Sequence, residues 1–391
     1  MKRLSITVLL LAPAIAGNAQ QVSEVVSMFA FDLYAKTAAG NSSNFVFSPM
    51  SITPAFGMVA LGARGETQKQ LDATFHFQPN TNFHSELGKL QQKVLKSAGD
   101  SVEICIANRA WIEKSYRVLG KYSKSLRRSY NAKIYTTDFI GNFEGSRLLI
   151  NKTIQADTKD YIKDLLPQGS LDEMTRLVLT NAIYFKGKWE VPFDPKRTSA
   201  RDFTLSSGEK VKCPTMLADD KFGYYVGTSY QALALNYRGS KLSLLILLPN
   251  EDTPMADFEK NLSLKLYQQA VAGLNPEKVT VLLPKFTIET SLSLKQTLSD
   301  MGMPIAFSNE ANFSGISGKN DLKISDAFHK AYIEVSEEGT TATAATAVVV
   351  AIKSMLPANT FVANRPFVYI LRHKDTGAIL FMGKVENPLS H

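Results

Sequence analysis

The apolar residues of this chain follow a helical spacing near its N-terminus. Between residues 22 and 39 they recur at positions 22, 25, 26, 29, 30 and 33, which form one face of a helix. Gly40-Asn41 then provides a helix stop. Ser48-Pro49 opens a second apolar helix that reaches Gly62, and a third helical pattern covers residues 146–165.

Most of the later apolar runs have the length and β-branched content of buried strands. Many of them end at Pro or Gly. Because helical patterns prevail in the first 170 residues and strand patterns afterwards, the order of elements predicts an α+β fold. The strand-like runs are residues 102–112, 177–185, 242–248, 279–283, 327–335, 367–371 and 379–385.

The N-terminal residues predict export, and the lack of a linker predicts a single domain. Residues 1–19 begin with Lys2 and Arg3, continue with an apolar run and finish in small residues, which is the pattern of a secretory signal peptide. A buried first helix is the alternative, and Pro13 inside the run disfavours it. Residues 20–338 contain no Gly/Ser linker, repeat or low-complexity tract. We therefore expect residues 20–391 to form a single domain in a secreted or extracytoplasmic location.

Composition limits the possible partners. The formal net charge is +8 over 391 residues, and two of the positive charges are Lys2 and Arg3. The remaining excess is too dispersed for a dedicated nucleic-acid binder or for a claimed polyanion activator. After the leader, no apolar run is long enough to span a membrane. Cys105 and Cys213 are the only cysteines; two buried free thiols are favoured, although a pairing stays open.

Catalytic motifs are missing from the sequence. The five histidines include no His-Glu-x-x-His pair and no Cys/His cluster, and there is no Gly-x-Ser-x-Gly or Gly-x-Gly-x-x-Gly element. We therefore expect no enzyme, no metal and no cofactor. His329 shares an apolar strand face with Ala327 and Ala331, which favours a hydrogen-bonded core residue over a catalytic base.

One segment breaks the pattern of the rest. Residues 339–364 contain a single charged side chain, Lys353. The small and β-branched residues before it would suit a buried strand, but the run is too long for one. It also follows directly on the strand expected at residues 327–335. A second strand in the same sheet would require a sharp reversal at Gly339.

Eight motifs together resemble the serpin family of serine protease inhibitors. They occur in the family's order across essentially all of residues 22–388. The matching segments are residues 44–52 (NFVFSPMSI), 181–189 with 192–193 (NAIYFKGKW, PF), 283–286 (LPKF), 313–316 (FSGI), 329–331 (HKA), 337–340 (EEGT), 364–367 (NRPF) and 381–388 (FMGKVENP).

The resemblance implies a single domain with three β-sheets, eight or nine helices and an exposed reactive-centre loop, here about residues 339–360. In this family a protease cuts the loop of a metastable protein. The part before the cut then enters the large sheet as a new strand and carries the acyl-enzyme along. The resemblance therefore implies a suicide inhibitor rather than an enzyme.

The hinge that must enter the sheet consists of small or flexible residues. Gly339 is expected to supply the permissive backbone at the reversal. Neither Pro nor a charged residue occurs between Gly339 and Ala347, which favours an inhibitory member. The hinge residues are Glu337, Glu338, Gly339, Thr340, Thr341, Ala342, Thr343, Ala344, Ala345 and Thr346.

Counting from the hinge as in the family places the scissile bond at Lys353-Ser354. A lysine there suits the acidic specificity pocket of trypsin-like proteases. In a random loop it would be an ordinary solubilising lysine. A shift to Ile352 would instead suit elastase-like or subtilisin-like proteases, and the apolar residues before it keep that alternative open.

The resemblance also assigns residues that control the opening of the sheet. Ser48, Ser51, Asn181 and His329 match the shutter under its centre, and Trp189 matches the aromatic residue of the breach at its top. Pro54 departs from the family, which commonly has a small residue at that position.

Together these features predict a secreted, monomeric inhibitor of trypsin-like serine proteases, without a cofactor, a metal, a nucleic acid or a membrane as partner. A non-inhibitory carrier or chaperone of the same fold is the alternative from another class. An inhibitor of elastase-like, subtilisin-like or cysteine proteases is the alternative within the class.

Overall fold

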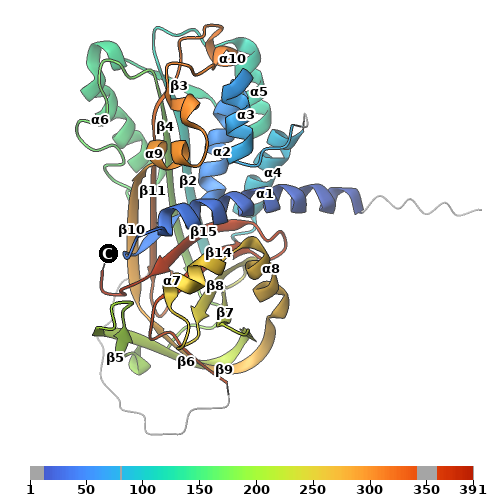
Figure 1. The fold of residues 1–391 in the computed structure, drawn as a ribbon, viewed down its shortest axis with the longest axis vertical. Coiled ribbons are helices and arrows are strands. Elements are labelled where there is room, and N and C mark those ends of the chain that lie inside the picture. The colour runs from blue at the N-terminus through green and yellow to red at the C-terminus, as the bar shows by residue number, and fades with distance from the viewer. Residues whose placement is uncertain (1–12, 80–81, 341–358, 391) are drawn as a thin grey trace, which may run out of the picture.

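The computed structural model describes residues 13–79, 82–340 and 359–390, with side chains from residue 20 onward. Figure 1 shows an elongated molecule in which helices gather around one end of a set of long strands. The helices are α1 (Pro13–Ala38), α2 (Pro49–Ala60), α3 (Gly65–Thr74), α4 (Phe83–Lys96), α5 (Gly120–Tyr130), α6 (Phe139–Asp157), α7 (Met255–Asn261), α8 (Leu264–Gly273), α9 (Leu294–Asp300) and α10 (Ser314–Ser317), with short 3₁₀ turns at Pro195–Arg197 and Pro304–Phe307.

All seven expected strands are present, several of them longer than expected, and the described residues contain eight further strands. They are β1 (Phe45–Phe47), β2 (Val102–Glu113), β3 (Ile134–Thr137), β4 (Leu177–Lys188), β5 (Ser199–Thr204), β6 (Lys210–Val226), β7 (Tyr230–Asn236), β8 (Leu242–Pro249), β9 (Asn275–Pro284), β10 (Phe286–Ser293), β11 (Ile324–Val335), β12 (Gly339–Thr340), β13 (Thr360–Val362), β14 (Phe367–His373) and β15 (Ile379–Val385). The α+β class is confirmed.

The six-stranded sheet has the order β10-β11-β12-β4-β2-β3. Its three longest strands, β2, β4 and β11, each have 12 residues. Helix α6 covers one face, where Phe139, Ile150 and Ile154 pack against residues of β2, β4 and β11. Helices α1, α2, α4 and α5 share the other hydrophobic core with the opposite face. The sheet is therefore enclosed between two layers of helix (Figure 1).

The other described strands form one continuous nine-stranded sheet. The resemblance implied two further sheets, but the 17-residue strand β6 pairs with β5, then with β9 and then with β7 along its length. The long strand β6 therefore joins the two implied sheets into one hydrogen-bonded sheet. Strands β8, β14 and β15 are buried at every residue, which explains their nearly uninterrupted apolar sequences.

One expectation about local structure was wrong, and the expectation of two buried free thiols is confirmed except for the burial of Cys105. The helix expected over residues 146–165 ends at Asp157, because Lys159, Asp160 and Asp164 have positive φ. Ile162 and Leu165 still pack under α6, but from irregular chain. Both cysteines are free thiols, and Cys213 is buried while Cys105 is only half-buried, since it lies in the partly exposed first half of β2.

Pro54 lies inside α2 and changes its hydrogen bonding. Proline has no backbone N–H, so the carbonyl of Met50 lacks its helical donor. The side chain of Gln91 in α4 donates to that carbonyl instead, over 3.4 Å. A second helix thus supplies the bond that the sequence of α2 removes.

Restoring the missing donor gives a test of this arrangement. We expect Pro54→Ala to raise the free energy of unfolding by about 1–3 kcal/mol, because an alanine supplies the N–H that the Met50 carbonyl needs. The urea midpoint measures the change. In that background Gln91→Leu should cost less than it does in the wild-type chain. An unchanged or lower midpoint for Pro54→Ala would contradict the assignment.

Candidate functional site

The chain reverses sharply after β11 and enters the same sheet again. Between Ser336 and Gly339, the two backbone amides donate to each other's carbonyls over 2.8 and 3.3 Å. Strand β12 then lies between β11 and β4, antiparallel to both, with Thr340 opposite Val335 and Gly187. Further along, β11 and β4 pair directly and in parallel, from Ile324 opposite Leu177 to Tyr332 opposite Tyr184. Two residues thus occupy an interface that is otherwise closed.

Gly339 is required for a reason other than the expected one. Its φ is not among the positive values in the chain, so the reversal does not depend on a left-handed glycine. A Cβ at this position would instead lie 1.9 Å from the carbonyl oxygen of Gly187 and 2.8 Å from Cα of Lys188. Only glycine allows β12 to approach β4 so closely.

Trp189 closes the top of this interface. Its buried indole donates from Nε1 to the carbonyl of Ser336 over 2.9 Å and stacks on Tyr237, with ring centroids 4.7 Å apart. The hydroxyls of Tyr237 and Thr340 lie 2.7 Å apart. The breach residue therefore contacts both the turn before β12 and, through Tyr237, β12 itself.

Glu337 anchors the same turn by charge. Its carboxylate forms an ion pair with Lys285 over 2.8 Å and accepts a hydrogen bond from the hydroxyl of Thr198 over 2.9 Å. Burial alone would raise the pKa of Glu337, but the bonds from Lys285, the backbone and Thr198 outweigh it and hold the pKa below its usual 4.5. The turn before β12 is thus fixed by a charged pair that is largely shielded from water.

A second cluster crosses the middle of the sheet. His329 in β11 lies opposite Asn181 in β4, which in turn lies opposite Asn108 in β2. The Asn181 amide donates to the Ser51 hydroxyl of α2 over 2.7 Å and to Asn108 Oδ1. Asn108 also donates to the Ser51 carbonyl over 2.9 Å. The cluster therefore ties three strands to the helix beneath them.

His329 is neutral and fixed in one tautomer. Its Nε2 accepts the backbone N–H of Ser48 over 3.2 Å, so the ring proton lies on Nδ1, which bonds to Asn181 Oδ1. Burial lowers the pKa of His329 to about 3. Both ring nitrogens are engaged, as expected for a core histidine. Ser48 caps α2 with its side chain as well.

The structure thus brings Ser48, Ser51, Asn181 and His329 together in the middle of the sheet and places Trp189 at the top of the same interface. The sequence reasoning missed Asn108, Lys285 and Tyr237. An asparagine within the apolar strand at residues 102–112 was a visible signal. Lys285 lies in the LPKF motif of residues 283–286, but neither it nor Tyr237 has a local pattern that indicates its partner, because the partners are distant in the sequence.

Several expected site residues lie outside the described part of the chain. These are Thr341, Ala342, Thr343, Ala344, Ala345, Thr346, Lys353 and Ser354, together with residues 1–12 of the leader.

Two searches for other chemistry were negative within the described ranges. In residues 13–79, 82–340 and 359–390, no three His, Cys, Asp or Glu side chains are grouped as a metal site would need. The helices in that part of the chain are too short or too polar to cross a membrane.

Comparison with known proteins agrees with this geometry. The family model described as serpin (serine protease inhibitor) matches residues 24–388. Leukocyte elastase inhibitor of Xenopus laevis is 37% identical over 94% of this chain and its own whole length. Antithrombin-III of Ovis aries is 38% identical over 94% of this chain and 82% of its own.

A solved structure extends the agreement to the fold. Human thyroxine-binding globulin in complex with its hormone superposes with a TM-score of 0.85, at 29% identity, covering 95% of this chain and all of the other. The family match, the relatives and the fold agree over nearly the whole chain. The chain therefore belongs to the serpin family.

Proposed function

We propose that this chain is a secreted, monomeric suicide inhibitor of trypsin-like serine proteases. The position of β12 is the observation that carries the proposal. The first two loop residues already lie between β11 and β4, and below them these strands pair directly. A strand that continued β12 would replace one parallel interface by two antiparallel ones, which are slightly more stable per residue. Insertion is therefore favourable once the loop is released.

Cleavage provides that release. The protease serine attacks the carbonyl of Lys353, an ester forms, and the peptide bond to Ser354 breaks as its amine leaves. The loop before the cut is then free at one end. The small hinge residues pass into the sheet, and the ester-linked protease travels with them before water removes it.

The lengths of the flanking strands agree with a cut at Lys353 or at the neighbouring Ile352. If the register of β12 is extended along β4, residue 350 would pair with Leu177, at the far end of that strand. Opposite β11, the same register assigns Ile324 to residue 351. An inserted strand therefore uses all of its partners and leaves Lys353 just beyond the end of the sheet.

Two other functions have specific support. The apolar residues before Lys353 and the relatives named leukocyte elastase inhibitor favour cleavage after Ile352 by an elastase-like protease. A structural neighbour named for thyroxine binding supports a carrier. The hinge opposes a carrier, since it has neither Pro nor charge between Gly339 and Ala347. Export rests on the leader pattern of residues 1–19.

Mixing the protein with trypsin tests the central claim. We expect a covalent complex that survives a denaturing gel, with cleavage after Lys353 located by mass spectrometry. Thr346→Arg is the matched variant, because it keeps the cleavage site but puts a charge into the inserting strand. It should be cut without forming a complex. Complete cleavage of the wild-type chain with no complex would refute inhibition, and a cut after Ile352 would refute the trypsin-like preference.

The Glu337–Lys285 pair should slow spontaneous insertion. We expect Glu337→Gln to convert several-fold faster to the inactive, self-inserted form on warming, as followed on native gels. Because the pKa of Glu337 is lowered in the folded protein, its stabilisation is present above pH 4.5 and is lost as the pH falls through the lower folded value. Wild-type conversion should accelerate in that range.

The exposed pair Asp202–Lys212 gives the control, because Asp202→Asn removes a surface ion pair. It should leave the conversion rate unchanged. Equal rates for Glu337→Gln and the wild type would show that the pair does not hold the turn.

His329 should control the middle of the sheet. We expect His329→Leu to polymerise or convert at a lower temperature, because Asn181 and the Ser48 N–H lose their partner. The wild-type protein should lose stability as the pH falls from 6.5 toward 3, since the unfolded chain binds a proton there that the folded ring does not. This loss should be smaller in His329→Leu. His76→Gln, at a partly exposed hydrogen bond with Asp32, is the control, and an unchanged conversion temperature in His329→Leu would contradict the role.

A further inference from the structure

A cavity of about 530 Å³ lies between the end of β5, the turn that joins β13 to β14 and the first residues of α7. Its volume is in the range of small-molecule binding sites. These strands belong to the nine-stranded sheet, whereas the interface of β4 with β11 lies in the six-stranded sheet. The cavity is therefore separate from the site described above.

Arg365 supplies the only positive charge of the described lining, and its side chain is 17% exposed. Its Nε donates to the Pro249 carbonyl and its Nη1 to Asn364 Oδ1, each over 2.8 Å. A guanidinium has five N–H groups. For the other three, the described part of the chain offers no acceptor within hydrogen-bond distance, since the carboxylate of Glu251 lies 3.9 Å from Nη1 and is largely exposed. Arg365 therefore retains free donors at the wall of the cavity.

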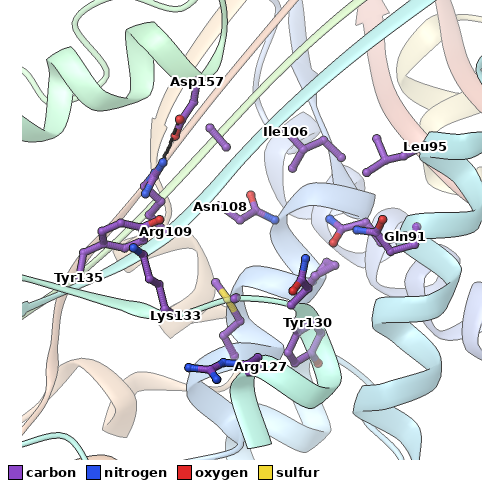
Figure 2. Close-up of a pocket in the computed structure, with 16 residues that line it drawn as sticks. Gln91, Leu95, Ile106, Asn108, Arg109, Arg127, Tyr130, Lys133, Tyr135 and Asp157 are labelled. Atoms are coloured by element: carbon purple, nitrogen blue, oxygen red, sulfur yellow. Dashed lines mark hydrogen bonds and ion pairs between the residues drawn. The ribbon is translucent and has the colours of Figure 1, made fainter. Parts of the chain in front are cut away.

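Arg109 shows how this chain pairs a guanidinium that is buried to the same extent. Its side chain is 16% exposed. Its Nε and Nη2 donate to both carboxylate oxygens of Asp157, over 2.6 and 2.8 Å. Figure 2 shows these two side chains pointing toward each other. Arg365 has the same burial without a carboxylate of this kind.

The two arginines differ in the stability of their charge as a result. Burial would lower the pKa of Arg109, but the hydrogen bonds and the charge of Asp157 outweigh it, so the pKa is raised. Burial also acts on Arg365, where the more distant Glu251 opposes it only in part, so the pKa is lowered. A carboxylate bound across Nη1 and Nη2 of Arg365 would supply the charged partner that Arg109 already has.

The rest of the lining is mainly apolar and rigid. The apolar residues are Leu205, Pro249, Pro254, Met255, Ala256 and Pro366. Three of them are prolines, whose rings restrict the backbone, so this wall keeps its shape without a ligand. The thioether of Met255 is a favourable neighbour for an aromatic ring. A flat ring suits such a wall better than a flexible chain, which would lose more conformational entropy on binding.

We propose that this cavity binds a small aromatic carboxylate, with the carboxylate at Arg365 and the ring against the prolines and Met255. An apolar wall with one well-placed charged group is the usual composition of a small-molecule site. This binding activity goes beyond the proposed inhibition of proteases and does not depend on it.

Calorimetric titration of the whole protein tests binding. The probes are 2-naphthylacetate, its uncharged amide 2-naphthylacetamide, decanoate and acetate. We expect 2-naphthylacetate to bind about tenfold more tightly than the amide, the usual effect of a hydrogen bond between charged groups. Decanoate should bind more weakly than 2-naphthylacetate. Acetate should give no measurable heat, because it lacks the apolar surface that the wall would bury.

Three variants locate the ligand. Ala256→Phe puts a ring into the cavity from an exposed position on α7 and should abolish binding. Glu251→Gln removes an exposed negative charge near the guanidinium and should tighten binding about two- to fivefold. Arg365→Lys keeps the charge but loses the paired donors, and it should weaken binding about tenfold. Ala272→Phe, at an exposed alanine of α8 outside the cavity, is the control and should bind like the wild type.

Each contrary result overturns a defined part of the proposal. No binding of 2-naphthylacetate excludes the site, and full affinity in Ala256→Phe places the ligand elsewhere. Equal affinity for the amide excludes the role of Arg365, and tighter binding of decanoate excludes the aromatic ring. Ala256→Phe and Glu251→Gln change exposed side chains only, so the test does not depend on the stability of Arg365→Lys. A protein that traps trypsin but binds no probe would refute this cavity assignment alone, and binding without a trypsin complex would refute the proposed inhibitor alone.

Discussion

The parallel pairing of β4 with β11 is the interaction on which the rest of the molecule depends. It closes the six-stranded sheet below the two residues of β12. Under the proposed function, a new strand that enters between β4 and β11 would form two antiparallel pairings in place of one parallel pairing. Under that function, the native pairing is therefore held by a kinetic barrier rather than by the most stable pairing.

The barrier is built from two unlike groups of residues. At the top, an ion pair and two stacked aromatic rings fix the turn that leads into β12. In the middle, an uncharged chain of amides, hydroxyls and one neutral imidazole joins the strands to α2. The first group depends on a carboxylate and is sensitive to acid. The second depends on hydrogen-bond partners that are lost together when the strands separate.

Sequence reasoning recovered the strands better than the contacts between them. Buried strands such as β8 and β15 are continuous apolar runs, so their positions follow from composition. The end of α6 could not be predicted in this way, because Ile162 and Leu165 continue an apolar spacing although the chain has left the helix. Ser48, Asn181 and His329 could be grouped only through the family resemblance. The partnership of Glu337 with Lys285 joins residues far apart in sequence, which no local pattern encodes.

The two residues of β12 also determine the alignment of a chain that would follow them. In an antiparallel pair, residue numbers rise along one strand as they fall along the other. Extending the register of Thr340 with Val335 and Gly187 would therefore place Thr346 opposite His329 on one side and opposite Asn181 on the other. The incoming threonine would thus arrive where the bond between that imidazole and that amide must part. Its hydroxyl both donates and accepts. In the proposed inhibitor, the residue that separates the pair would therefore also offer each of its two members a new hydrogen-bond partner.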